Sequence, residues 1–358
     1  MADAGLVFEV EKSDWKRTRF VEGPVPELAP GQVLFRVDRF ALTANNISYA
    51  LSGDLLGYWR FFPCEAGWGR IPVMGFADVI RSTHSGVKEG TRCFGFYPMA
   101  RHLVIQPGAV SPAQIVDAAP HRAGLAPPYA QYLPTTGDAV YAQPREDQIL
   151  LMRGLFMTSF LADDFFAEQD YCGARSVLIS SASSKTSIAL AFQVKQGGRA
   201  RAIGLTSARN ADFVRKLGFY DQVVLYDQIA SLAKQPAVFV DMAGDGAVTA
   251  AVHGHFGDEL KADCTIGATH WSANRQHEGL PGPKPQFFFA PAQIVKRSKD
   301  WGPQVLSQRI ASAWTRFCDA SDAWLHVVRS RGREALERVY QDTLAGRTRA
   351  ADGHVLSL

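Results

Sequence analysis

Hydrophobic and polar positions follow one pattern in the first part of the chain and another in the rest. Up to about residue 150, short apolar runs at 31–42, 71–82 and 102–108 alternate with glycine, proline and long loops. Apolar runs of this length between turn residues are typical of strands. No stretch here has the 3.6-residue apolar spacing of a long amphipathic helix. We therefore expect a β-rich, loop-rich first part.

From about residue 151 the pattern becomes helical and then alternates. Residues 151–169 have helical spacing of large apolar side chains, and short β-branched runs then alternate with helix-like segments. Such alternation predicts a parallel, doubly wound sheet. Its expected strands are 176–180, 202–206, 222–226, 237–241 and 263–269, and its expected helices are 186–196, 208–218 and 247–257. After a Pro/Gly-rich link at 279–286, we expect helices through 305–317 and 332–346 and a final strand at 353–358.

Composition narrows the class of protein. A chain of 358 residues is long enough for two domains. The net charge of +3 is spread along the chain, which argues against a nucleic-acid partner. The apolar runs are too short to span a membrane, and no signal peptide is visible. Five scattered cysteines fit reduced thiols, so we expect a cytoplasmic protein with no structural zinc.

The segment 176–192, "SVLISSASSKTSIALAF", joins an expected strand to an expected helix through a serine-rich turn. Its Lys-Thr dipeptide resembles the end of a P-loop, which needs glycine directly before the lysine and again five residues earlier. Those positions hold Ser184 and Ile179. A phosphate-loop NTPase therefore stays only a weak alternative.

The dinucleotide-binding fingerprint places its three glycines at Ser181, Ser184 and Ser187. Serine is small, and backbone N–H groups at the helix start would still face a pyrophosphate, with Lys185 adding charge. The end of the second strand carries Ser207 and Arg209 and no carboxylate before residue 212. An arginine there is typical of NADP(H) binding. The plain alternative is a solvated helix start capped by Ser207.

Several segments, in order and spacing, resemble the medium-chain dehydrogenase/reductase superfamily, in its zinc-independent quinone-reductase and enoyl-reductase-like branch. The segments that carry this resemblance are 26–53, 71–96, 151–166, 175–187, 212–227 and 336–358. The resemblance implies an α/β fold with a GroES-like β-rich catalytic domain at 1–150 and 286–358. It also implies a Rossmann-type doubly wound nucleotide domain at 151–285. Members often dimerise through the nucleotide domain, so a homodimer is one expected state, and the sequence leaves the oligomeric state open.

Zinc ligands of the metal-dependent relatives are missing at their expected positions. Gly75-Phe76-Ala77 stands where those enzymes carry Gly-His-Glu, and no cysteine lies near residues 43–46. A catalytic zinc needs three protein ligands at one site. We expect no metal. The pair His253 and His255 is a weak alternative metal site, and we expect both side chains at the protein surface instead.

The resemblance also implies positions for the site residues. Asn45, Asn46, Tyr49 and Tyr58 correspond to residues that face the nicotinamide and the substrate. From the residues alone, a group of nearby aromatic side chains either lines an apolar substrate cleft or forms the core of its loop: Tyr58, Trp59, Phe61, Phe62 and Trp68. The expected cofactor-binding residues are Thr158, Ser181, Ala182, Ser183, Ser184, Lys185, Thr186, Ser207, Arg209, Tyr226, Met242, Ile266, Gly267 and Phe288.

These observations predict a zinc-independent, NADPH-dependent oxidoreductase. It would reduce a C=C bond conjugated to a carbonyl, or a ketone, in a moderately apolar small molecule. The alternative is a catalytically silent NADP(H)-binding protein on the same fold. The sequence does not identify the substrate or the proton donor.

Overall fold

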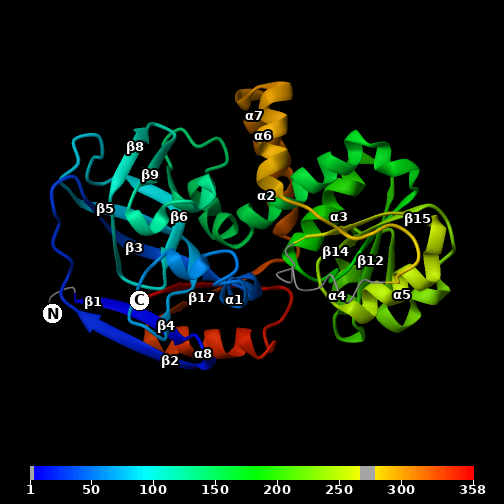
Figure 1. The fold of residues 1–358 in the computed structure, drawn as a ribbon, viewed down its shortest axis with the longest axis horizontal. Coiled ribbons are helices and arrows are strands. Elements are labelled where there is room, and N and C mark those ends of the chain that lie inside the picture. Colours follow the sequence, from blue (N-terminus) through cyan, green and yellow to red (C-terminus); the bar gives the residue numbers. More distant parts are fainter. Residues whose placement is uncertain (1–3, 267–278) are drawn as a thin grey trace. The chain divides into compact units, whose positions relative to one another are not determined.

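The computed structural model describes residues 4–266 and 279–358 (Figure 1). Its internal contacts divide the chain into two compact units. The first unit contains the chain up to Leu151 together with Leu325–Leu358, and the second contains Met152–Trp324. No helix of these described ranges is long and apolar enough to cross a membrane.

The first unit is built on two sheets whose strands pair antiparallel, except that β17 and β18 pair in parallel. A small sheet has the order β2-β1-β4, and a larger one has the order β17-β18-β3-β5-β6-β10-β9-β8, with β7 also pairing with β3. The strands are β1 (Gly5–Glu11), β2 (Asp14–Gly23), β3 (Val33–Leu42), β4 (Trp68–Gly69), β5 (Pro72–Ser82), β6 (Arg92–Pro98), β7 (His102–Ile105), β8 (Pro107–Ser111), β9 (Gln114–Asp117), β10 (Gln131–Pro134), β17 (His326–Arg331) and β18 (Asp352–Ser357). The helices are α1 (Ala44–Leu51) and α8 (Arg333–Leu344).

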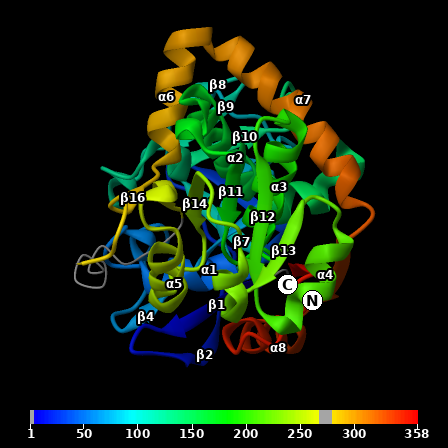
Figure 2. The same ribbon diagram turned by 90° about the vertical axis from the view of Figure 1, so that its right-hand side faces the viewer.

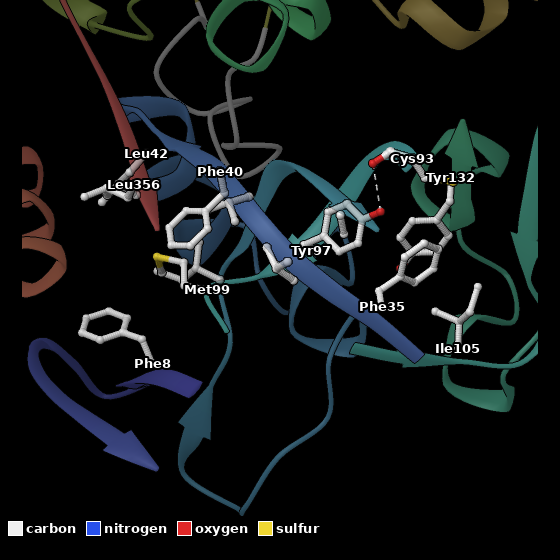
Figure 3. Packing of buried hydrophobic residues seen from close by; sticks show 14 of the residues in the cluster. Phe8, Phe35, Phe40, Leu42, Cys93, Tyr97, Met99, Ile105, Tyr132 and Leu356 are labelled. Carbon is white, nitrogen blue, oxygen red and sulfur yellow. Dashed lines mark hydrogen bonds between the residues drawn. The ribbon is translucent and has the colours of Figure 1, made fainter. Parts of the chain in front are cut away.

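The core of this unit lies around β3, whose apolar side chains are buried on both faces (Figure 3). The Phe35 ring packs 5.7 Å from the Tyr97 ring and 5.3 Å from the Tyr132 ring. The Tyr97 hydroxyl donates to the carbonyl oxygen of Cys93 at 3.2 Å, so its polar end is satisfied inside the core. Burying each such aromatic side chain contributes roughly 1.5–3 kcal/mol. The core therefore fixes the strands from which α1 and its neighbouring loops extend.

The second unit contains a parallel sheet in the order β13-β12-β11-β14-β15-β16 (Figure 2). Numbered from β11, this order is third, second, first, fourth, fifth, sixth, which is the order of the dinucleotide-binding fold. The strands are β11 (Ser176–Ile179), β12 (Arg201–Thr206), β13 (Gln222–Leu225), β14 (Ala237–Asp241), β15 (Leu260–Thr265) and β16 (Gln286–Phe287). The helices are α2 (Glu146–Glu168), which begins in the first unit, α3 (Lys185–Gly197), α4 (Ala211–Lys216), α5 (Gly246–Phe256), α6 (Ala290–Trp301) and α7 (Pro303–Ser321).

The division of the chain differs from the expected domain boundary at residue 285. The strand β16 pairs in parallel with β15, with Gln286 opposite Cys264. The helix α7 places Trp314 and Phe317 against Phe156 of α2, with ring centroids 5.4 and 5.2 Å away. Residues 286–324 therefore belong to the second unit, because their strand pairing and aromatic packing are made with residues of that unit.

Candidate functional site

A serine-rich turn connects the end of β11 to the start of α3. Ser184 caps the helix, because its hydroxyl oxygen accepts the Ser187 backbone N–H at 3.1 Å. The Ser187 hydroxyl donates to the carbonyl oxygen of Ser180 at 2.9 Å and closes the turn. Two of the three serines at fingerprint positions thus use their hydroxyls to hold the turn itself.

Ser181, at the first fingerprint position, has a φ of +49°. Such left-handed backbone favours glycine and costs other residues roughly 1–2 kcal/mol. Its backbone N–H donates to the Tyr226 hydroxyl at 3.1 Å. Tyr226 therefore lies at the loop, where its hydroxyl accepts a hydrogen bond from the backbone.

The close approach between the loop and the neighbouring strand depends on Gly204 of β12. A Cβ at Gly204 would lie 3.0 Å from the Ala182 Cβ and 2.8 Å from the Tyr220 ring. The Ala182 N–H donates to the Leu205 carbonyl at 3.1 Å, and the Tyr220 hydroxyl donates to the Ala182 carbonyl at 2.8 Å. Close packing, which a loop glycine permits in the fingerprint, is thus permitted here by Gly204 of the adjacent strand.

The start of α3 keeps backbone donors available. Among the residues that the structure describes, none accepts from the backbone N–H groups of Ser183 or Thr186. N–H groups of a first helical turn have no partner within the helix and bind anions readily. Lys185, the first helical residue, adds a positive charge. The turn can therefore hold a phosphate group.

The end of β12 lies beside this turn. The Asn210 side-chain amide donates to the Ser183 hydroxyl at 3.0 Å, which joins the 3₁₀ segment Ala208–Asn210 to the loop. Ser207 precedes this segment, and its side chain makes no capping hydrogen bond. Arg209 is exposed within it. Ser183 and the residues expected at the cofactor's 2′-phosphate are thus brought together.

Ser180 and Asp241, two residues that sequence reasoning did not select, tie β11 to β14. The Ser180 hydroxyl donates to Asp241 Oδ1 at 2.7 Å and accepts the Met242 N–H at 2.8 Å. Asp241 Oδ1 also accepts the N–H groups of Ala243 and Gly244 at 2.9 and 3.1 Å. In the dinucleotide-binding fold, ligands bind where the strand order reverses, between the first and fourth strands. This hydrogen-bond network lies at that position in the sheet. Its only signal in the sequence was a serine directly after one buried strand and an aspartate at the end of another.

Other expected cofactor residues are spread around the same sheet. The Thr158 hydroxyl donates within α2 to the Gly154 carbonyl at 3.1 Å, whereas the next residue, Ser159, donates to the Thr186 carbonyl at 2.8 Å. Ile266 follows β15, and its N–H donates to the Asp241 carbonyl at 2.9 Å. Gly267 lies outside the described residues.

Phe288 follows the edge strand β16 and is buried. Its N–H donates to the Thr265 carbonyl at 3.0 Å. Its side chain helps to line a cavity of about 410 Å³ with Phe165, Ala262 and Cys264. Phe288 therefore contributes both backbone and ring to the β15–β16 edge.

In the first unit, α1 carries three of the four expected catalytic residues. Asn45 and Tyr49 lie one turn apart on the same face, and the Asn45 amide donates to the Tyr49 hydroxyl oxygen at 2.7 Å. Asn46 is buried, where its side-chain oxygen accepts the Thr43 N–H at 2.8 Å and its amide donates to the Pro72 carbonyl at 2.9 Å. Asn45 and Tyr49 are thus available to a ligand, while Asn46 fixes the start of the helix.

Tyr58, the fourth candidate, stacks on Tyr49 with ring centroids 4.4 Å apart. Its hydroxyl lies 3.2 Å from that of Tyr129, which sequence reasoning did not single out. Burial raises the pKa of both Tyr49 and Tyr58. Both phenols therefore stay protonated near neutral pH and can act as hydrogen-bond donors.

The aromatic residues of 58–68 pack mainly into buried clusters, as expected of a loop core. Tyr58, Phe61 and Phe62 make one buried cluster with Phe96, in contact with Tyr49 and Tyr129. Trp59 instead belongs to the main core of the first unit. Trp68 stacks under the Arg19 guanidinium at 4.0 Å. The cluster around Tyr58 is the part of this segment that accompanies the candidate residues.

His253 and His255 have protein partners. His253 is fully buried, with Nε2 2.7 Å from Asp263 Oδ2 and Nδ1 2.7 Å from the Pro281 carbonyl oxygen. The expectation that His253 lies at the surface was wrong, because its ring is held between two acceptors inside the fold. Within residues 4–266 and 279–358, no group of three or more potential ligands could hold a metal ion.

Solved structures share this fold over nearly the whole chain. CurA from Vibrio vulnificus in complex with NADPH is 12% identical, with a TM-score of 0.59 and 98% of each chain covered. The quinone oxidoreductase from Coxiella burnetii is 15% identical, with a TM-score of 0.54, 99% of this chain and 100% of that chain covered. The yhdH oxidoreductase from Salmonella enterica in complex with NADP is 13% identical, with a TM-score of 0.53 and 99% of each chain covered.

These likenesses confirm the predicted fold class, a GroES-like β-rich domain with a Rossmann-type parallel sheet, as in medium-chain quinone and enoyl reductases. No curated protein sequence matches the chain. A family model described as "Protein of unknown function (DUF2855)" matches residues 40–349. The chain therefore belongs to the DUF2855 family, on the fold of the medium-chain reductases.

Proposed function

We propose that this protein is a zinc-independent, NADPH-dependent oxidoreductase that reduces a C=C bond conjugated to a carbonyl, as in an enone, enoyl compound or quinone. The observation that carries the proposal is the phosphate-sized turn at the reversal point of the parallel sheet. There, Ser180 and Asp241 join β11 to β14 beside the open N–H groups of α3. The reaction class also draws on the reductases that share the fold.

NADP(H) fits the residues at this turn. The N–H groups of Ser183 and Thr186, with Lys185, would hold the pyrophosphate. Arg209 and Ser207 would hold the 2′-phosphate, since this stretch carries no Asp or Glu to bind a ribose hydroxyl pair. When bound, the nicotinamide supplies a hydride.

The catalytic residues lie in the first unit. Addition of a hydride to the β-carbon of an enone moves an electron pair onto the carbonyl oxygen. Tyr49 keeps its proton free to donate, because its oxygen accepts from Asn45. A neutral phenol aimed at the developing negative charge stabilises it, as an oxyanion-hole donor does.

The segment between Tyr49 and Tyr58 in the chain exposes large aliphatic side chains. Leu51, at the end of α1, and Leu55 and Leu56, which follow it, are 48%, 59% and 40% exposed. Exposed aliphatic side chains close together in the chain favour binding of an apolar partner. We propose that the substrate is a small carbonyl compound with an apolar body. We also propose that the chain assembles into a homodimer.

A catalytically silent NADP(H)-binding protein is the second candidate. The observation that favours it is the hydrogen bond from the Ser181 N–H to Tyr226, which leaves the turn with one donor fewer for a phosphate. Such a protein would bind NADPH and leave enones and quinones unchanged.

The test starts with NADPH fluorescence during titration of the protein, followed by NADPH oxidation with a panel of enones and quinones. We expect binding, and turnover with at least one apolar enone or quinone. Binding without turnover across the panel selects the silent protein, and absence of binding overturns both candidates.

Arg209→Ala tests the cofactor assignment. We expect the ratio of NADPH to NADH affinity to fall about tenfold, because roughly one charge-assisted phosphate contact is lost. Arg215→Ala is the matched control, since Arg215 pairs with Asp212 on the exposed surface of α4. An unchanged preference in Arg209→Ala contradicts the 2′-phosphate assignment.

A further inference from the structure

Three tyrosine side chains from three separate segments pack together in the first unit. Tyr49 comes from α1, Tyr58 from the 3₁₀ turn Tyr58–Arg60, and Tyr129 from the 3₁₀ turn Pro127–Ala130. The Tyr58 ring lies 4.4 Å from the Tyr49 ring and 5.6 Å from the Tyr129 ring. Tyr129 is thus part of the same cluster as the two candidate donors.

The hydroxyls of Tyr58 and Tyr129 share one hydrogen bond, with their oxygens 3.2 Å apart. Each phenol has a single proton, so one hydroxyl donates and the other keeps its proton for another acceptor. Tyr58 is 5% exposed, whereas Tyr129 is half-buried. Tyr129 can exchange its hydrogen bonds with water, and Tyr58 depends on Tyr129 or on a ligand.

The position of Tyr129 is fixed from behind. Arg122, buried beside Asp117, donates to the Tyr129 carbonyl oxygen at 3.3 Å and to Asp117 at 3.2 Å. The Tyr129 ring packs 5.3 Å from that of Phe61 and 5.6 Å from that of Phe96. A buried ion pair and two aromatic neighbours therefore hold the hydroxyl in place.

We propose that Tyr129 is a positioning residue of the carbonyl site: its hydroxyl donates to Tyr58, so that the Tyr58 hydroxyl donates to the carbonyl oxygen of the substrate. The proposal rests on the proposed function and adds to the Tyr49 donor a second phenol, Tyr58, together with the residue that orients it. A phenol that accepts a hydrogen bond becomes a stronger donor, because chains of hydrogen bonds polarise one another.

The protons balance in this arrangement. A hydride adds to the β-carbon, the C=C pair shifts toward the carbonyl carbon, and the C=O pair becomes a lone pair on an enolate oxygen. The Tyr58 O–H bond breaks as its proton goes to that oxygen, and the Tyr129 proton goes to the Tyr58 oxygen. Water at Tyr129 returns the proton. The net addition is one hydride and one proton.

The first test is Tyr129→Phe, with 2-cyclohexen-1-one and NADPH. We expect kcat to fall about tenfold and the solvent deuterium isotope effect on kcat to change, while KM for NADPH stays the same, since one hydrogen bond worth roughly 1.4 kcal/mol is lost. Tyr340→Phe is the matched control. It removes a hydroxyl that donates to the Trp15 carbonyl at 2.9 Å, elsewhere in the first unit, and should leave kcat and the isotope effect unchanged.

The second test measures binding without turnover, by calorimetric titration of cyclohexanone into protein saturated with NADP⁺. We expect Tyr129→Phe to raise the dissociation constant about tenfold relative to wild type and to Tyr340→Phe. If the variant binds and reduces as wild type does, the inference is overturned and the proposed function stands. If wild type binds cyclohexanone through Tyr129 and reduces nothing in the panel, the proposed function fails and the inference stands. A wild-type protein that binds no cyclohexanone overturns the inference.

Discussion

The serine-rich turn of the second unit and the tyrosine cluster of the first use side chains in opposite ways. In the turn, the hydroxyls of Ser180, Ser184 and Ser187 bond to the chain itself, and the groups left for a ligand are backbone N–H groups. In the cluster, backbone and buried polar groups hold the aromatic rings, and the groups left for a ligand are phenol hydroxyls. The turn suits a phosphate, whose charge any N–H donor can bind, whereas phenol hydroxyls suit a carbonyl oxygen that gains negative charge.

The largest effect should come from removing the carboxylate that holds the turn. Asp241→Ala leaves Ser180 and two backbone N–H groups of a buried network without their acceptor, and we expect a loss of roughly 3 kcal/mol in the free energy of unfolding. Urea denaturation measures it. Asp245→Ala is the control, since it removes only the cap of α5 and should cost about 1 kcal/mol. Equal losses in the two variants would show that the Ser180–Asp241 link is not what organises the turn.

Next in size is the loss of a donor from the cluster. In Tyr49→Phe we expect kcat/KM for an enone to fall about 100-fold, an effect of roughly 2.7 kcal/mol on the transition state, with NADPH affinity unchanged. Steady-state kinetics and NADPH fluorescence measure the two quantities. Asn46→Ala is the contrasting variant: it should lower stability, because Asn46 fixes the start of α1. If Tyr49→Phe kept the wild-type kcat/KM, the Tyr49 hydroxyl would be excluded as a donor to the substrate.

The smallest effect concerns backbone strain in the turn. Ser181→Gly relieves a left-handed conformation worth roughly 1–2 kcal/mol, offset in part by the greater freedom of glycine in the unfolded chain. We expect a net gain of up to about 1 kcal/mol in the free energy of unfolding. Ser183→Gly is the control, and it should lower stability because the Asn210 amide loses its acceptor. A less stable Ser181→Gly protein would mean that the Ser181 side chain itself supports the turn.

Much of the second unit could be predicted from the sequence, because its pattern of apolar and polar residues repeats over short stretches of the chain. Each of β11, β12 and β14 is a short apolar run within a parallel sheet, and such runs stand out between helices. The expected strand 222–226 appears as Gln222–Leu225, and the expected helix 247–257 as Gly246–Phe256. In the first unit, the strand β17 was missed, because its side chains are only partly buried.

The helix α1 was also missed. It has only eight residues and begins with a Thr43–Asn46 capping pair. Asn46 was selected for catalysis because asparagine at this place in the resembled family faces the nicotinamide. In the structure, its side-chain oxygen accepts the Thr43 N–H and its side-chain amide donates to the Pro72 carbonyl oxygen. A side chain's hydrogen-bond partners across the fold cannot be deduced from its spacing along the chain.

The sequence alone determined the alternation of strands and helices, the serine turn at a strand–helix junction and the absence of an acidic residue between β12 and Asp212. These are short-range properties, fixed by periodicity and by neighbours in the chain. Only the tertiary structure decided that Gly204 supplies the close packing expected from a loop glycine, that Ser180 meets Asp241, and that Tyr129 joins Tyr58. Each of these pairs lies far apart in sequence, and folding brings them together because buried polar groups must find partners and buried surfaces must fit.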